Sequence, residues 1–235
     1  MVEARQVVVV AGVGPGIGVA LARRFTEGGY AVALLARERK KVEDLAKEVP
    51  GSRGYSCDVS DPGSIREAFT RTRDEIGDVD VLLFNAGSGV FKSVEDITPA
   101  DFENAWRVNA YGALLCSQAV IPAMKQRGAG AIIFTGATAS LRGGKATAAF
   151  APAKAAQRSL AQSMARSLGP AGVHVGLIIV DGVVDIPRIR KTMPDKPTDF
   201  FVDPAGVAEA AWQLVHQDPR AWSFEIDIRP FGETW

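Results

Sequence analysis

Four glycines follow the first apolar run of the chain and form a candidate phosphate-binding turn. They are Gly12, Gly14, Gly16 and Gly18. Glycine permits a sharp turn and a close backbone approach to a pyrophosphate, and the helix behind it offers free N–H groups. The spacing is G-x-x-x-G-x-G, because Ile17 stands where G-x-G-x-x-G would need its third glycine. The turn therefore predicts a dinucleotide site, with a purely structural turn as the alternative.

The charged residues after the second apolar run indicate which dinucleotide would bind. Nicotinamide sites recognise a 2′-phosphate with Arg and a 2′-hydroxyl with Asp or Glu. Arg37 stands at this place, followed by Glu38, Arg39 and Lys40. We expect NADP(H) in preference to NAD(H), with Arg37 on the phosphate and Arg39 or Lys40 assisting. Glu38 leaves recognition of a ribose hydroxyl open, and the run also fits a solvated helix start.

Alternating strands and helices must position these residues. Strands are predicted over residues 6–11, 31–36, 53–57, 79–84, 131–135, 173–180 and 223–229. Helices are predicted over 15–28, 38–49, 62–76, 99–108, 110–127, 148–168 and 204–216. The alternation predicts an α/β fold with a doubly wound parallel sheet and helices on both faces. No break in composition divides the chain, so residues 1–235 are expected to form a single dinucleotide-binding domain.

Four motifs resemble the short-chain dehydrogenase/reductase family over about residues 5–230. They are the glycine turn, Cys57-Asp58-Val59, Asn85-Ala86-Gly87 and Val108-Asn109-Ala110-Tyr111-Gly112. The resemblance implies a Rossmann-like sheet of about seven strands in the order 3-2-1-4-5-6-7. It also implies an NAD(P)-dependent oxidoreductase.

The resemblance assigns a set of residues to the cofactor. They are Gly12, Gly14, Gly16, Ile17, Gly18, Arg37, Asp58, Val59, Asn85, Ala86, Gly87, Lys154, Gly182 and Val183. Asp58 is expected near the adenine. Gly182 follows the sixth strand, where the family usually has Pro-Gly, and is expected to permit a close approach. Val183 and Ile186 are expected to flank the nicotinamide through backbone groups.

Only some of the catalytic residues of the family are present in this sequence. The family uses Tyr-x-x-x-Lys with a Ser thirteen residues before the Tyr. Here Lys154 is kept, Phe150 replaces the Tyr, and Ala137 stands at the Ser position. Thr138 could take the place of the Ser if the loop shifts the register by one residue. Asn109, which in the family holds a water linked to the Lys, is retained.

These replacements weaken the proton-donating half of the chemistry. In the family the Tyr protonates the carbonyl oxygen of the substrate, and the Ser donates a hydrogen bond to that oxygen. The Lys lowers the pKa of the Tyr and holds the nicotinamide ribose. Losing a positioned general acid typically costs about 10²–10⁴ in rate. Proton supply from water, Thr138, Ser140 or Lys154 remains open. Asp181 and Asp185 near the cleft are further possible relays, with a helix cap or a loop salt bridge as the alternative.

Three functions are consistent with this pattern. The first is an NADP(H)-dependent oxidoreductase of a carbonyl or alcohol group, with altered proton-donor machinery. The second is a catalytically degenerate NADP(H)-binding protein that acts as a sensor or partner subunit, and the third is a lyase or isomerase. Residues 187–204 form a long segment that would suit a substrate lid, and Met193, Phe200 and Phe201 within it favour an apolar small-molecule substrate.

The composition of the chain limits the classes of partner that we expect it to bind. Lys and Arg together number 27, as do Asp and Glu, so neither nucleic acid nor an anionic membrane is expected as a partner. Cys57 and Cys116 have no metal-ligand spacing, and no metal is expected. No stretch approaches the roughly 20 apolar residues of a membrane span, and a cytoplasmic location is expected. The resemblance implies a homodimer or homotetramer formed through the long helices 110–127 and 148–168.

Overall fold

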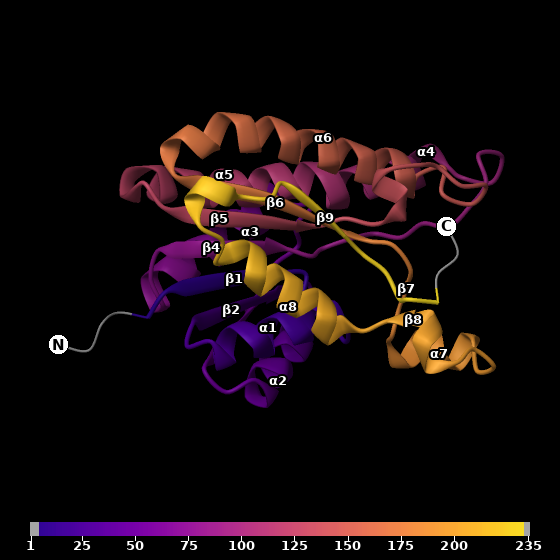
Figure 1. Cartoon of the computed structure of the whole chain (residues 1–235), viewed down its shortest axis with the longest axis horizontal. Coiled ribbons are helices and arrows are strands. Elements are labelled where there is room, and N and C mark those ends of the chain that lie inside the picture. Colours follow the sequence, from indigo (N-terminus) through magenta and orange to yellow (C-terminus); the bar gives the residue numbers. More distant parts are fainter. Residues whose placement is uncertain (1–4, 233–235) are drawn as a thin grey trace.

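Seven parallel strands form the central sheet (Figure 1) of the computed structural model, which describes residues 5–232. The strands are β1 (Val7–Ala11), β2 (Ala31–Ala36), β3 (Ser52–Ser56), β4 (Val79–Phe84), β5 (Gly130–Thr135), β6 (Val173–Val180) and β9 (Glu225–Ile228). Their order across the sheet is β3-β2-β1-β4-β5-β6-β9. The predicted order is therefore confirmed, with β9 in the seventh place.

Helices cover both faces of this sheet, as the strand composition requires. One layer holds α1 (Ile17–Glu27), α2 (Arg39–Glu48) and α8 (Pro204–Val215), and the other holds α3 (Pro62–Glu75), α4 (Pro99–Trp106), α5 (Gly112–Arg127) and α6 (Phe150–Leu168). Two hydrophobic cores, one on each face, separate the sheet from its helices. Every residue of β1 and β6 is buried, because helices cover both faces of these strands. Their largely apolar sequences are typical of strands in that position.

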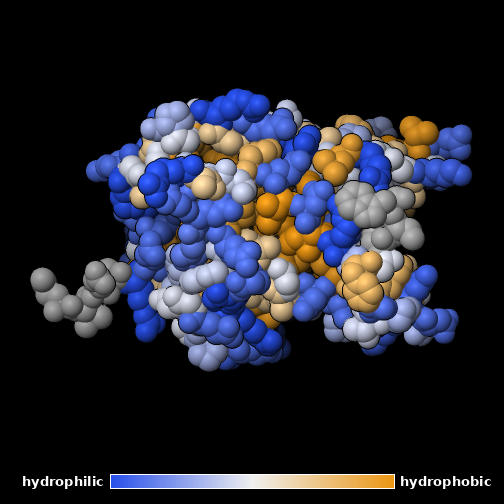
Figure 2. Space-filling view, in the orientation of Figure 1, coloured by the Kyte–Doolittle hydropathy of each residue, from blue (hydrophilic) through white to orange (hydrophobic). Residues whose placement is uncertain are grey.

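The edge strand β9 is less completely covered. Ile226 and Ile228 pack inward and are partly buried, whereas Asp227 between them is exposed. Figure 2 shows the matching surface, where hydrophobic residues gather over β9 on a face that is otherwise largely hydrophilic. The alternation is that of a strand with one solvated face.

The helix that follows the glycine turn starts differently from α3. Asp61 caps α3 by accepting hydrogen bonds from the N–H groups of Gly63 and Ser64. Helix α1 has no side-chain cap and begins at Ile17, two residues later than predicted. The delay has a physical reason, because Gly16 has a φ of 107°, which is not helical. The first N–H groups of α1 are therefore left for a ligand or solvent.

The two helices predicted over 99–108 and 110–127 form one continuous helical run. A π-helical turn, Arg107–Tyr111, joins α4 directly to α5 and contains Asn109 at its centre. The predicted break at residue 109 is wrong, since no residue there leaves helical geometry. Single π turns inside α-helices are common at functional sites, and this one carries a buried asparagine.

Residues 187–204 contain more regular structure than predicted. Helix α7 (Pro187–Thr192) opens the segment, and β8 (Phe201–Val202) pairs in parallel with β7 (Val183–Val184) in a small second sheet. Asp185 accepts two hydrogen bonds from the Arg190 guanidinium, which also lies 4.1 Å from the centre of the Phe201 ring. Of the three interpretations left open for Asp185, a relay, a helix cap or a loop salt bridge, the structure has the salt bridge.

Candidate active site

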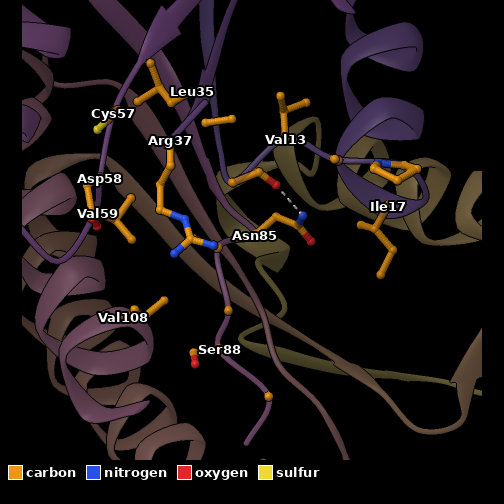
Figure 3. Close-up of a pocket in the computed structure, with 18 of the residues that line it drawn as sticks. Val13, Ile17, Leu35, Arg37, Cys57, Asp58, Val59, Asn85, Ser88 and Val108 are labelled. Atoms are coloured by element: carbon orange, nitrogen blue, oxygen red, sulfur yellow. Dashed lines mark hydrogen bonds between the residues drawn. The ribbon is translucent and has the colours of Figure 1, made fainter. Parts of the chain in front are cut away.

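A cavity of about 580 Å³ opens at the carboxyl ends of β1, β2, β3 and β4, shown in close-up in Figure 3. Ligands of open α/β sheets bind at this edge. Ten of the predicted cofactor residues line it: Gly12, Gly14, Ile17, Gly18, Arg37, Asp58, Val59, Asn85, Ala86 and Gly87. Gly16 lines a neighbouring cavity of about 770 Å³ between α1, α2 and the start of α8. Gly182, Val183 and Lys154 line neither cavity, whereas Val184 and Ile186 reach the first.

The glycines of the turn have different roles. A Cβ on Gly12 would lie 2.4 Å from the Ala86 backbone, and one on Gly18 would lie 2.8 Å from the Val13 Cα atom. These two glycines permit close packing of the turn. A Cβ on Gly14 would meet nothing within 4 Å, so the open space beside it belongs to the cavity.

Asn85 secures the turn from the next strand. Its Nδ2 donates a hydrogen bond of 2.8 Å to the Gly12 carbonyl, drawn as a dashed line in Figure 3. This bond joins the end of β4 to the end of β1. It gives Asn85 a structural role in shaping the cavity wall.

Arg37 enters the cavity from the end of β2 (Figure 3). Within residues 5–232 its guanidinium has no hydrogen-bond or ion-pair partner, although the neighbouring Glu38 binds Lys41 at 2.6 Å. Glu38 is thus already engaged with a cation, while the Arg37 charge is available. An unpaired guanidinium in a cavity is suited to an anionic group such as a phosphate.

Apolar walls and one carboxylate form the end of the cavity beyond Arg37. Asp58 Oδ1 accepts hydrogen bonds from the backbone N–H and the hydroxyl of Ser60, at 2.9 Å and 2.7 Å. Burial raises the pKa of the neighbouring Cys57 thiol to about 12, so this cysteine is an inert part of the wall. Leu35 and Val59 provide the apolar surface on which a planar ring could lie.

Lys154 is buried on α6 with only neutral hydrogen-bond partners. Its Nζ donates to the Thr135 carbonyl at 2.8 Å and to Gln157 Oε1 at 3.1 Å. Burial without a compensating negative charge lowers the pKa of Lys154 to about 7. The lysine therefore exchanges a proton close to neutral pH.

Asn109 lies with this lysine behind Gly87, a residue of the cavity lining. Its Nδ2 donates to the carbonyls of Ala105 and Ser88, while its buried Oδ1 has no hydrogen-bond partner among the described residues. A Cβ on Gly87 would lie 3.4 Å from this oxygen and 3.9 Å from Lys154 Nζ. An orphaned acceptor and a lysine thus border the same cavity-lining glycine.

An aromatic pair stands where the family has its tyrosine. The Phe150 ring contacts the Phe91 ring, with centroids 5.5 Å apart and planes tilted by 54°. The loop that carries Phe91 is held against the start of α6 by a bridge between Lys92 and Thr147. No hydroxyl is present at residue 150 to donate a proton.

Neither the serine position nor the adjacent Thr138 replaces that hydroxyl. The N–H of Ala137 donates to Ser140 Oγ at 3.1 Å, and the Thr138 hydroxyl donates to Asp181. Asp181 also lies 3.7 Å from the Arg229 guanidinium. The Thr138 proton is therefore directed to a carboxylate and away from an external oxygen.

Gln157 is the site residue that reading the motifs missed. It is wholly buried and joins Lys154 to the backbone of the π turn. The available signal was its position three residues after Lys154, on a helix face that otherwise buries Ala153, Ala161 and Met164. A long polar side chain on an apolar face requires a partner.

Comparisons with known proteins identify the family of this chain. The family model for short chain dehydrogenases matches residues 6–197. D-xylose 1-dehydrogenase of Caulobacter vibrioides is 34% identical over 180 residues, which are 75% of this chain and 71% of that protein. A short-chain dehydrogenase structure from Rhodopseudomonas palustris is 33% identical with a TM-score of 0.82, covering 96% of this chain and 99% of that one.

A third match was solved with a dinucleotide. The alcohol dehydrogenase from the archaeon Thermococcus sibiricus, complexed with 5-hydroxy-NADP, is 26% identical with a TM-score of 0.86 over 98% of both chains. The chain therefore belongs to the short-chain dehydrogenase/reductase family of NAD(P)-dependent oxidoreductases, and the resemblance drawn from its motifs is confirmed.

Residues 5–232 contain no helix that is both long and apolar enough to cross a membrane. They also contain no cluster of three or more His, Cys, Asp or Glu side chains that could hold a metal ion.

Proposed function

We propose that this chain is an NADP(H)-dependent oxidoreductase that acts on a carbonyl or alcohol group of an apolar small molecule. Family membership supports the reaction class, and the unpaired Arg37 guanidinium supports the cofactor preference. Arg37 is the observation that carries the proposal, because a 2′-phosphate is what separates NADP(H) from NAD(H).

The residues present fit a dinucleotide. The open space beside Gly14 and the uncapped N-terminus of α1 would receive the pyrophosphate, and Arg37 would bind the 2′-phosphate. Leu35, Asp58 and Val59 would enclose the adenine end. The orphaned Asn109 Oδ1 and Lys154 Nζ would face the nicotinamide end through Gly87. When bound, the nicotinamide supplies or accepts the hydride.

Proton transfer must follow a route different from the usual one of the family. Phe150 and Ala137 offer no hydroxyl, and the Thr138 hydroxyl is bonded to Asp181. Lys154 Nζ lies behind the cavity-lining Gly87 and has a pKa near neutrality, about 7. We therefore assign the exchangeable proton of the site to Lys154 Nζ.

An apolar substrate matches the surface around residue 150. Phe91 is 67% exposed and Leu141 is 43% exposed. Both belong to loops next to the start of α6. Within the 187–204 segment, Met193 is 37% exposed. We propose that this segment, held by the Asp185–Arg190 ion pair, covers the substrate as a lid.

The experiment is NADPH oxidation with a panel of aldehydes, ketones and quinones, together with a binding measurement for NADPH. Turnover of at least one compound, abolished by Lys154→Ala, supports the oxidoreductase. Tight NADPH binding with no turnover of any compound overturns it.

The second outcome would favour a binding protein without turnover. Phe150 and Ala137 are the observation behind this candidate, because both remove groups that the family uses for proton donation. Such a protein would bind NADP(H) as a sensor or as a subunit of an assembly.

A further inference from the structure

Gln157 is a fully buried polar side chain that the family pattern does not explain. It lies on α6 one turn after Lys154, among buried apolar neighbours such as Ala153, Ala161 and Met164. A buried amide costs free energy unless its donor and acceptor ends are both bonded. The partners of Gln157 therefore show what this residue does.

Both ends of the amide are used, and its orientation follows from chemistry. Oε1 accepts a hydrogen bond from Lys154 Nζ at 3.1 Å, and Nε2 donates one of 2.9 Å to the Asn109 carbonyl. A carbonyl can only accept and an ammonium group can only donate, so the amide cannot be flipped without losing both bonds.

The Asn109 carbonyl comes from the π-helical turn Arg107–Tyr111. A π turn departs from the regular i+4 bonding of a helix, and here the carbonyl in its centre accepts a bond from α6. Hydrogen bonds thus connect the backbone of the π turn, through the Gln157 amide, to Lys154 Nζ.

These hydrogen bonds determine the direction in which the Lys154 ammonium group points. An ammonium group has three N–H bonds, of which one goes to Thr135 and one to Gln157. We propose that Gln157 is a positioning residue that holds Lys154 so that its remaining N–H faces the cavity floor at Gly87. The proposal rests on the proposed nicotinamide site at that floor.

The ionisable groups on the elements around α6 have other partners. Asp101 pairs with Lys92, Glu103 pairs with Arg107, and Asp181 contacts Thr138 and Arg229.

The uncharged titratable groups near α6 are stacked or buried. The Tyr111 ring stacks on Trp106, Cys116 is buried, and the buried His174 is bonded to the Ser223 carbonyl. None of them contributes to the lowered pKa of Lys154, whose cause is burial.

Substituting Gln157 should therefore move the titration of Lys154 in a direction set by the new side chain. Gln157→Leu removes an acceptor from the ammonium form, so the pKa should fall below that of the wild type. Gln157→Glu places a carboxylate against Nζ, so the pKa should rise. Gln162→Leu, on the same helix and without a side-chain hydrogen bond among the described residues, is the matched control.

The measurement is an NMR titration of lysine labelled with ¹³C at Cε in the full chain, with the Lys154 signal assigned by its loss in Lys154→Met. We expect a downward shift of about one pH unit or more for Gln157→Leu and an upward shift for Gln157→Glu, with none for Gln162→Leu. Should Gln157→Leu fail to fold, the upward shift in Gln157→Glu still tests the proposal. Unchanged titration in a folded Gln157 variant would overturn it.

A second readout separates this inference from the proposed function. NADPH affinity should drop about tenfold in Gln157→Leu, which corresponds to the loss of one well-placed hydrogen bond, and should not change in Gln162→Leu. An NADPH affinity equal to that of the wild type would contradict the positioning role at the cavity. Failure of the wild type to bind NADPH would overturn the proposed function, while the titration result would still decide whether Gln157 orients Lys154.

Discussion

Phe150 and Lys154 stand one turn apart on α6, and together they define what this site can and cannot do. The lysine is held behind the cavity-lining Gly87 by two neutral oxygens, whereas the ring at residue 150 packs on Phe91. A lysine beside a tyrosine would lower the pKa of the phenol, but a phenyl ring has no proton to tune. The lysine of the family's pattern is present, while a phenylalanine stands at the place of its usual acid.

Restoring the missing hydroxyl should therefore increase activity. Phe150→Tyr places a phenol one turn before Lys154, and a positioned general acid is worth about 10²–10⁴ in rate. We expect kcat for carbonyl reduction to rise by about 10² or more. Phe91→Tyr adds the same group to the neighbouring ring and is expected to give no comparable gain. An unchanged kcat in Phe150→Tyr would show that proton donation at this position does not limit the reaction.

The buried Lys154 should also leave a signature in stability. Its pKa of about 7 in the folded protein lies below the value of about 10.4 for an unfolded lysine. The unfolded chain therefore binds more protons between these values, and the free energy of unfolding should rise with pH from about 7 to about 10. The expected slope from this group is about 1.4 kcal/mol per pH unit.

Lys154→Met should remove that slope, since methionine does not titrate. Denaturant unfolding of both proteins at several pH values from about 6 to about 10 measures the difference. Lys125→Met, at an exposed position of α5, is the control and should keep the wild-type slope. Parallel stability profiles for the wild type and Lys154→Met would mean that Lys154 keeps an ordinary pKa.

At the level of elements, the glycine turn combines close packing with an open binding surface. Gly12 and Gly18 are required because other backbone atoms lie within 3 Å of where a Cβ would stand. Gly14 has no such neighbour and has no positive φ, so its backbone would accept a side chain. Only the space of the cavity explains a glycine at this position.

Gly14→Val should thus weaken dinucleotide binding without unfolding the protein. We expect NADPH affinity to drop at least about tenfold, because the side chain would occupy space meant for the pyrophosphate, while Tm stays within a few degrees of the wild type. Gly206→Val on α8 also meets nothing within 4 Å and serves as the control. Calorimetric titration that gave equal affinities for Gly14→Val and the wild type would remove the turn from the cofactor site.

The elements also show where sequence patterns stop being informative. The strands and the turn were predictable because each depends on a local signal, either a run of buried β-branched residues or a glycine spacing. The π turn at Asn109 has no such signal, since Arg107–Tyr111 has the composition of an ordinary helix. Gln157 was missed because its role depends on a carbonyl 48 residues away. The β7–β8 pair, only two residues per strand, depends on tertiary contacts alone.

At the level of the whole molecule, the strand order brings distant motifs to one edge of the sheet. Residues near 12, 37, 58 and 85 follow β1, β2, β3 and β4, which are neighbours in the sheet, so their carboxyl ends together form the cavity. The order was predictable from the family resemblance. Positions 182 and 183, assigned to the cofactor by the same resemblance, lie outside the cavity, whereas Ile186, also expected near the nicotinamide, lines it together with Val184.

We also propose that the molecule assembles as a homodimer or homotetramer through α5 and α6. The outer face of α6 carries small exposed residues, among them Pro152, Ala155 and Ser159, which would permit close helix packing. Ala155→Arg should shift the protein to a smaller species in analytical ultracentrifugation, whereas Ala221→Arg, in the α8–β9 connection, should not. A wild-type monomer at micromolar concentration would contradict this assembly.

Binding of NADPH in preference to NADH through Arg37 is the most direct test of the function assigned to the cavity. Calorimetric titration of the wild type, Arg37→Asp and Arg39→Asp with both dinucleotides makes that measurement. We predict that the wild type binds NADPH more tightly, that Arg37→Asp reverses the preference, and that Arg39→Asp leaves NADPH as the tighter ligand. Equal affinities of the wild type for NADPH and NADH, or an unchanged preference in Arg37→Asp, would contradict the assignment of the 2′-phosphate to Arg37.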